Sequence, residues 1–160
     1  MKNMMLRVKN FSTFVLCTLL LLAAGCKKND SNSDEPATLG ANVARPTWTA
    51  TENYDYPSSM TAVVKVDLAA QYPASAKDFA LHDDDLLAAF SSAGECLGVA
   101  TCHDGLFFLY VAGTEGAVTL RYYSAYYKNI FVAQDAITFR TDAMPGTVAN
   151  PFVPVFKVAE

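Results

Sequence analysis

Short apolar stretches of strand length, separated by turn residues, constrain this chain more than any other feature of its sequence. From residue 60 onward, apolar and polar side chains alternate with a period of two, and glycine-containing or acidic turns interrupt them. Turns that return at intervals of about 8–12 residues are typical of antiparallel sandwiches and barrels. The stretches predict strands over residues 60–67, 86–90, 95–102, 106–112, 117–123, 127–132, 137–140 and 151–158.

The expected fold class is therefore all-β, an antiparallel two-sheet sandwich, Ig-like or jelly-roll-like, with about seven to nine short strands. At most one short helix is expected, within residues 68–82, where Ser75 could cap a helix over residues 76–81. With 160 residues, of which 52% are hydrophobic, the chain can build one ordinary core. We expect a single domain over residues 46–160.

The first 25 residues have the layout of an export signal. Lys2, Arg7 and Lys9 form a positive region, and residues 14–24 form an apolar run. This run is too short to span a bilayer, which needs about 20 apolar residues. It matches the hydrophobic region of a signal peptide, so residues 1–25 are predicted to be removed on export.

The end of this signal resembles the lipobox of bacterial lipoproteins, with a leucine and small residues before Cys26. The resemblance implies that Cys26 is lipidated and anchors the chain to a membrane; an ordinary secretory signal with a chance cysteine is the alternative. Residues 26–45 are largely polar and predict a flexible tether. Lys27 stands where aspartate favours inner-membrane retention, so the resemblance favours the outer membrane, facing either the periplasm or the cell surface.

The charge of the mature chain excludes one class of partner. Without Lys2, Arg7 and Lys9, nine basic and sixteen acidic residues remain, a formal net charge of −7. Such a chain repels phosphate backbones, so we expect no nucleic-acid partner.

Several motifs in the domain occur in the order of a known module. They are Tyr54-Asp55-Tyr56, Ser59-Met60-Thr61, Ala88-Ala89-Phe90, Gly94-Glu95-Cys96-Leu97-Gly98-Val99-Ala100, Leu120-Arg121-Tyr122-Tyr123 and Gly146-Thr147. This order resembles an uncharacterised β-sandwich module of Bacteroidota surface lipoproteins, with the pattern A-A-F…G-E-C-x-G-V-A, over about residues 47–155. The resemblance implies fold and setting rather than chemistry. Leu97 stands where that module usually has arginine, and Ser124 where it usually has aspartate.

The sequence contains no strong metal-binding or catalytic motif. Asp83, Asp84 and Asp85, next to His82, are weak candidates for a calcium or transition-metal corner, but consecutive aspartates lack the spacing of a calcium loop. A solvated turn is the favoured interpretation, and we expect no metal and no cofactor. No nucleophile elbow, zinc motif or phosphate loop is present, so we expect no catalysis, with a small hydrolase as the remaining alternative.

Two cysteines remain in the domain, Cys96 and Cys102. An exported protein meets an oxidising compartment, which favours a disulfide. On one strand, however, six residues span about 20 Å, whereas a disulfide needs Cα atoms within about 7 Å. We therefore expect no bridge between them and a buried, small apolar role for Cys96.

Aromatic residues are the best candidates for ligand binding. Since neighbours on a strand face opposite sides, one residue of each adjacent tyrosine pair is expected to point outward and to contribute to a flat platform. Cross-strand packing within the sheet is the alternative, and the favoured one. The candidates are Trp48, Tyr54, Tyr56, Tyr122, Tyr123, Tyr126 and Tyr127.

The sequence thus predicts a membrane-anchored, extracytoplasmic binding or accessory module for a glycan or a protein partner. The alternative is a structural, adhesin-like surface domain. A glycan binder predicts exposed coplanar aromatic rings, whereas a structural module predicts buried tyrosines and an unpaired sheet edge.

Overall fold

The computed structural model describes the chain in three stretches, residues 38–50, 57–113 and 116–159. The export signal, Cys26, Tyr54 and Tyr56 lie outside the described residues, and their predicted roles stay predictions. By their internal contacts, residues Glu35–Glu160 form one compact unit. In the described stretches, no helix is long and apolar enough to cross a membrane.

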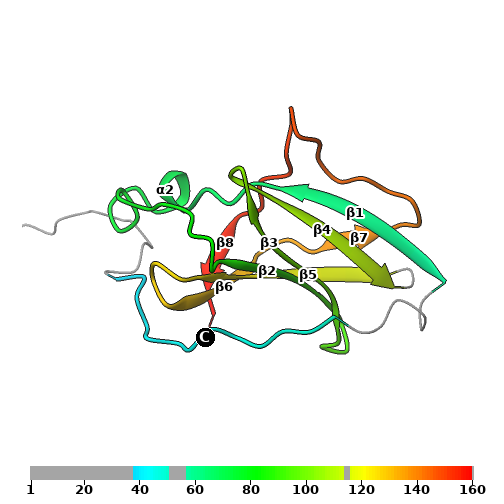
Figure 1. The fold of residues 1–160 in the computed structure, drawn as a ribbon, viewed down its shortest axis with the longest axis horizontal. Helices are drawn as coiled ribbons and strands as arrows, with labels where there is room; N and C mark the ends of the chain where they lie inside the picture. The colour runs from blue at the N-terminus through cyan, green and yellow to red at the C-terminus, as the bar shows by residue number, and fades with distance from the viewer. Residues whose placement is uncertain (1–37, 51–56, 114–115, 160) are drawn as a thin grey trace, which may run out of the picture. The chain divides into compact units, whose positions relative to one another are not determined.

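The described residues form eight strands and one very short helix, which confirms the all-β prediction (Figure 1). In chain order they are β1 (Ser58–Val64), α2 (Leu68–Gln71), β2 (Leu86–Ser91), β3 (Cys96–His103), β4 (Leu106–Gly113), β5 (Gly116–Ser124), β6 (Asn129–Ala133), β7 (Ile137–Phe139) and β8 (Phe156–Val158).

Each strand overlaps one of the predicted apolar stretches, because the turns between them are encoded locally. The β3–β4 hairpin shows this: Asp104 and Gly105 both have positive φ, 49° and 79°. Such values at both central residues define the tight turn that matches strand twist. Of the predicted last stretch, residues 151–158, only β8 pairs as a strand.

The helix lies within the predicted stretch, residues 68–82, but at its start rather than after Ser75. The side chain of Asp67 accepts a hydrogen bond from the Ala70 N–H at 3.1 Å and caps α2, and Pro73 follows its end. Residues 76–81, where the sequence predicted a helix, form turns instead. The prediction from Ser75 was wrong, because so short a helix depends on tertiary contacts, and Gln71 and Tyr72 at the end of α2 hydrogen-bond to backbone groups of residues 154 and 156.

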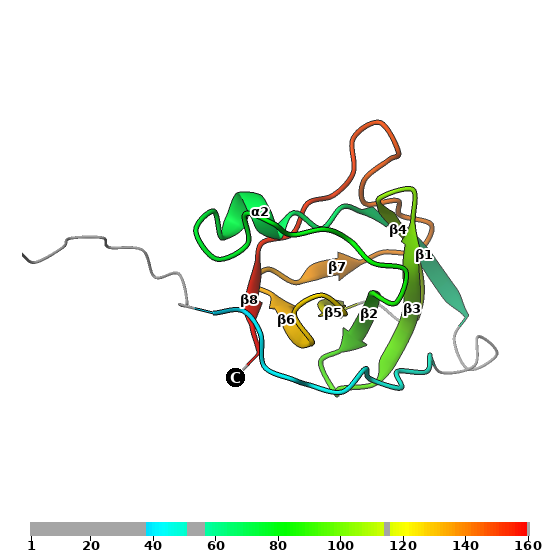
Figure 2. The ribbon, with the colours of Figure 1, turned by 60° about the vertical axis from the view of Figure 1, so that its left-hand side comes forward.

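Seven strands follow one another in a single hydrogen-bonded path, β1-β4-β3-β2-β5-β6-β8, and β7 pairs with β5 beside β6. All of these neighbouring strands pair in the antiparallel direction. The path is one sheet, so the predicted division into two sheets is not confirmed. Figure 2 shows the sheet curling, with β8 and β6 on one side and β3, β4 and β1 on the other.

The inner face of the curled sheet holds the core. The Tyr122 ring of β5 lies at its centre, 5.9 Å from the Phe107 ring, 6.0 Å from the Phe131 ring and 5.8 Å from the Phe156 ring. These four side chains are at most 1% exposed. Aromatic groups from β4, β5, β6 and β8 therefore meet at one point, which ties the two ends of the sheet together.

The edge of β1 is covered by the segment that follows β7. The Thr61 and Val63 N–H groups donate to the carbonyl oxygens of Ala143 and Pro145 at 3.1 and 2.9 Å. These bonds occupy donors that would otherwise face another chain.

The edge of β8 is covered by α2 and the residue after it. Gln71 accepts a hydrogen bond from the Phe156 N–H at 2.8 Å and donates to the Pro154 carbonyl at 2.9 Å, and the Tyr72 hydroxyl donates to the Phe156 carbonyl at 2.8 Å. Side chains thus satisfy backbone groups of the last strand in place of another strand.

Residues 38–50, named the strap here, run below β2 and β6 in both ribbon views (Figures 1 and 2). The strap begins in the core, where Leu39 packs, and reaches the outer face of the sheet, where Trp48 contacts Phe90. Leu39 is 1% exposed, and its carbonyl accepts a hydrogen bond from the Asn129 side chain at 2.8 Å. The Val43 N–H donates to the Lys128 carbonyl at 2.7 Å. The part of the predicted tether from residue 38 to 45 is therefore docked on the domain.

Candidate functional site

Tyr122 and Tyr123 are both buried, at 0% and 5% exposure. They pair across the sheet with Leu87 and Leu86 of β2, so their side chains face opposite sides. The expectation that one of them points into solvent was wrong, because β5 lies inside the sheet and is covered on both faces at this position. Neither can form part of an exposed platform.

Tyr126 and Tyr127 lie in the turn after β5, and only Tyr126 is well exposed, at 54%. Their rings are 4.8 Å apart and perpendicular, at 86°. Tyr127 stacks on Phe79, with centroids 6.1 Å apart and an angle of 9°. The two tyrosine rings are therefore not coplanar and do not form a flat platform. Tyr127 instead packs against the turn at residues 73–79.

Trp48 is partly buried and holds the strap to the sheet. Its ring meets Phe90 edge-on, with centroids 5.6 Å apart at 80°. The Arg121 guanidinium carbon lies 4.4 Å from the centroid of the same Phe90 ring. Trp48, Phe90 and Arg121 thus form one packed group on the outer face, so the contacts of Trp48 serve packing.

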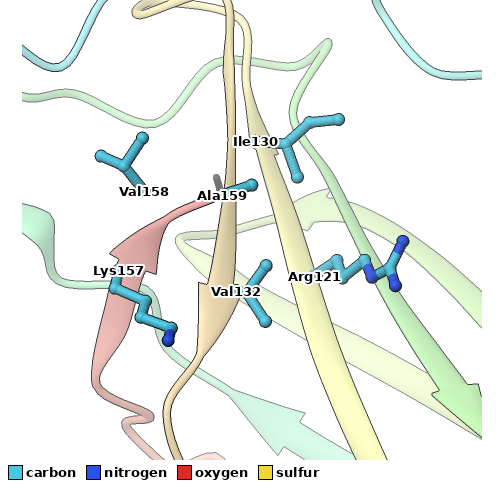
Figure 3. Close-up of a pocket in the computed structure, with 6 residues that line it drawn as sticks. All are labelled: Arg121, Ile130, Val132, Lys157, Val158 and Ala159. Atoms are coloured by element: carbon cyan, nitrogen blue, oxygen red, sulfur yellow. The ribbon is translucent and has the colours of Figure 1, made fainter. Parts of the chain in front are cut away.

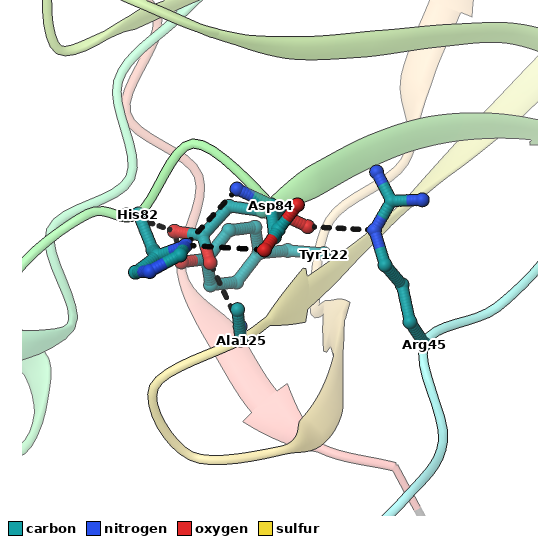
Figure 4. Close-up of polar contacts among 6 residues, drawn as sticks. Arg45, His82, Asp84, Tyr122 and Ala125 are labelled. Carbon is teal, nitrogen blue, oxygen red and sulfur yellow. Dashed lines mark hydrogen bonds and ion pairs between the residues drawn. The ribbon is translucent and has the colours of Figure 1, made fainter.

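Of the three consecutive aspartates, Asp85 is the one that stabilises the fold. It is fully buried and accepts three hydrogen bonds, from the Tyr122 hydroxyl at 2.6 Å, the His82 N–H at 3.0 Å and the Ala125 N–H at 2.8 Å (Figure 4). Burial raises the pKa of the Tyr122 hydroxyl, and the neighbouring Asp85 raises it further. The hydroxyl therefore keeps its proton and acts as a donor, and Asp85 joins the turn before β2 to the turn after β5.

Asp83 and Asp84 are exposed and form no joint site with Asp85. The Asp84 carboxylate lies 3.7 Å from His82 Nδ1, and the Asp84 carbonyl accepts a hydrogen bond from Arg45 Nε of the strap at 3.1 Å (Figure 4). In the described part of the chain, no group of three or more His, Cys, Asp or Glu side chains is placed to hold a metal ion.

Cys96 and Cys102 are both thiols and lie at the two ends of β3. Both are only partly buried, so Cys96 is less enclosed than expected. Burial raises the pKa of each thiol, which keeps it protonated and weakly nucleophilic.

Sequence reasoning missed an exposed aromatic pair on β4. Phe108 and Tyr110, named the aromatic strip here, are 45% and 46% exposed and lie on the same face of the strand. They stand opposite Val63 and Thr61 of β1. Because the stretch from Leu106 to Ala112 is apolar throughout, its sequence does not show which face is open to solvent.

A second feature is a shallow hollow of about 310 Å³ on the outer face of β5, β6 and β8, named the basic hollow here (Figure 3). Arg121, Val132 and Lys157 form one row across the three strands. Its lining residues are Arg121, Ile130, Val132, Lys157, Val158 and Ala159.

A comparison of the chain with family models, curated proteins and solved structures finds no match in any of the three.

Proposed function

We propose that this chain is a lipid-anchored, extracytoplasmic binding module that binds carbohydrate through the aromatic strip on β4. The observation that carries the proposal is the exposure of Phe108 and Tyr110, each close to one half, on one face of a strand. Large aromatic side chains are normally buried, so two exposed neighbours on a rigid element are typical of a contact surface.

The geometry of the strip suits a sugar. Alternate residues on a strand are about 6.8 Å apart, so the two rings can contact neighbouring units of one chain of pyranoses. Aromatic faces stack on the apolar C–H face of a sugar ring and bury area without needing a deep cleft. Thr61, directly opposite Tyr110, adds a hydroxyl that can exchange hydrogen bonds with sugar hydroxyls.

The strip is also held in place before any ligand arrives. β4 pairs with β1 over seven residues and is joined to β3 by the tight hairpin. At Gly98 of β3 the backbone approaches the Tyr110 carbonyl closely. A preorganised surface loses little conformational entropy on binding, which favours affinity from a small contact area.

The structural alternative has less support. A domain that assembles by strand addition needs an unpaired edge, whereas residues 142–152 occupy the edge of β1, and Gln71 and Tyr72 occupy the edge of β8.

The anchoring and setting rest on the sequence. The signal layout of residues 1–25, the small residues before Cys26, and Lys27 after it support lipidation and outer-membrane placement, on the periplasmic or the cell-surface side. The likeness to the Bacteroidota module supports the same setting. The docked strap leaves residues 27–37 between Cys26 and the domain.

We also propose that the curled sheet is best regarded as a sandwich. β3 and β4 share only two residue pairs, Cys102 with Phe107 and His103 with Leu106, next to their hairpin. β1 and β4 can therefore be regarded as one layer and the strands from β3 to β8 as the other, enclosing the Tyr122 cluster. An experimental structure that showed a regular β3–β4 ladder along the strands would contradict this.

A glycan screen tests the function. Residues 27–160, which contain the whole compact unit, are presented to a broad panel of soluble polysaccharides and oligosaccharides. We expect binding that is lost in Phe108→Ala and Tyr110→Ala and retained in Tyr126→Ala, which removes an equally exposed tyrosine outside the strip. Binding lost only in Tyr126→Ala would place the site at the turn after β5 instead.

A further inference from the structure

The basic hollow is a second surface feature, separate from the aromatic strip, with chemistry of its own. β3 and β2 lie between β4 and β5 in the sheet order, so the hollow on β5, β6 and β8 does not adjoin the strip. Its volume of about 310 Å³ is at the lower end of the range for small-molecule sites.

Two cations bracket the hollow. In the row across β5, β6 and β8, Arg121 and Lys157 stand on either side of Val132, with both strand pairings in register. Neighbouring strands are about 4.8 Å apart, which places the two backbones about 10 Å from each other. Figure 3 shows Lys157 on one side of Val132 and Arg121 extending from the other.

Neither cation is neutralised by a carboxylate in the described residues, where the ion pairs involve Lys65, His82 and His103 only. None of the described residues that line the hollow has an acidic side chain. In a mature chain with a net charge of −7, this is a local reversal of sign that attracts an anion.

The floor between the cations is aliphatic. Ile130, Val132 and Ala159 line it, whereas the Val158 side chain faces the core on the same side as Phe131. None of the six lining residues carries a hydroxyl, a carboxamide or an aromatic ring in its side chain. A sugar would find no side chain to stack on and no neutral polar group to bind its hydroxyls. An aliphatic chain, in contrast, would bury its methylene groups there and remove apolar surface from water.

Arg121 is fixed by its neighbours. Its guanidinium lies over the Phe90 ring, and Trp48 of the strap presses on that ring from another direction. A guanidinium held by stacking keeps its N–H edges available for a carboxylate.

We propose that the basic hollow binds an aliphatic carboxylate of medium chain length, with the acyl chain on Ile130, Val132 and Ala159 and the carboxylate at one of the two cations. The hollow combines positive charge with an aliphatic surface, so its ligand should combine a negative charge with an aliphatic chain. This site does not depend on carbohydrate binding at the aromatic strip.

Titration of residues 27–160 with sodium octanoate, followed by the amide shifts of a ¹⁵N-labelled sample, tests the proposal. We expect saturable shifts at Val132, Lys157 and Ala159 and none at Phe108. Sodium acetate, which lacks the chain, and 1-octanol, which lacks the charge, are each expected to bind at least about fivefold more weakly. No saturable shift with octanoate, or equal binding of sodium glucuronate, would overturn the proposal.

Charge removal gives the second arm. Lys157→Gln and Arg121→Gln are each expected to weaken octanoate binding about two- to fivefold, as for exposed ion pairs, and the double variant more. Lys77→Gln and Arg140→Gln make the same changes at exposed positions outside the hollow and are expected to change nothing. If these controls weaken binding as much as the hollow variants do, the attraction is that of overall charge and the site is refuted.

Discussion

Tyr122→Phe removes a single oxygen from the centre of the domain and tests how the buried polar group stabilises the fold. In the native chain the Tyr122 hydroxyl donates to Asp85 at 2.6 Å, and both residues are fully buried. The substitution leaves the aromatic packing of β5 intact and creates no large cavity. Its effect is therefore that of one hydrogen bond to a carboxylate.

The expected cost follows from the remaining partners. In the variant, the Asp85 carboxylate still accepts hydrogen bonds from the N–H groups of His82 and Ala125, at 3.0 and 2.8 Å. It therefore loses one of its three donors and is not left without a partner. Loss of a hydrogen bond to a charged group costs about 1.5–3 kcal/mol, and we expect about 2 kcal/mol here. For a domain of this size that lowers Tm by about 5–15 °C.

The assay is urea and thermal unfolding followed by circular dichroism, with Tyr123→Phe as the matched control. Tyr123 is the next residue, is equally buried, and faces away from Asp85, so its variant should stay within about 0.5 kcal/mol of the native chain. A double-mutant cycle with Asp85→Asn should show a coupling of at least about 1 kcal/mol. If Tyr122→Phe matches the native chain, or if the coupling is absent, the hydrogen bond does not stabilise the domain.

Four further predictions each rest on one feature of the molecule. Gly98→Ala brings a Cβ atom into a steric clash with the Tyr110 carbonyl oxygen, so we expect a loss of at least about 3 kcal/mol or failure to fold, measured by urea unfolding. Because the pKa of Tyr122 is raised in the folded state, the unfolded state loses this proton first, and stability should fall as pH rises above about 10; a loss of the same slope in Tyr122→Phe would contradict this. Trp48→Ala should release the strap and speed amide hydrogen exchange at Val43, whereas Thr49→Ala should leave it unchanged. Cys26→Ala should abolish incorporation of labelled palmitate in cells, and labelling that persists would refute the predicted anchor.

The strands could be predicted because their signals are local. The two-residue period and the turn at Asp104 and Gly105 depend on neighbouring residues alone, and each predicted stretch overlaps a strand. The helix could not be placed in the same way. The sequence pointed to Ser75 as the cap, whereas the helix forms after Asp67, where Gln71 and Tyr72 make tertiary contacts with the last strand and the residues before it.

The candidate site was harder to predict, because exposure depends on which strands become neighbours. Tyr122 and Tyr123 alternate as expected, yet the second face of β5 is covered as well. Phe108 and Tyr110 belong to a stretch of apolar residues that looks like a fully buried strand. Only the place of β4 in the sheet, next to β1 and away from the strap, leaves their outer face open.

The aromatic pair Phe108 and Tyr110 carries the functional account, and its contribution to affinity is the most direct measurement. The dissociation constant of the best glycan from the screen is determined by calorimetry for residues 27–160 and for the Phe108→Ala/Tyr110→Ala double variant. We expect at least a tenfold weaker affinity, about 1.4 kcal/mol, with the unfolding curve unchanged. An affinity equal to that of the native chain, in a folded double variant, would show that carbohydrate is not bound at this strip.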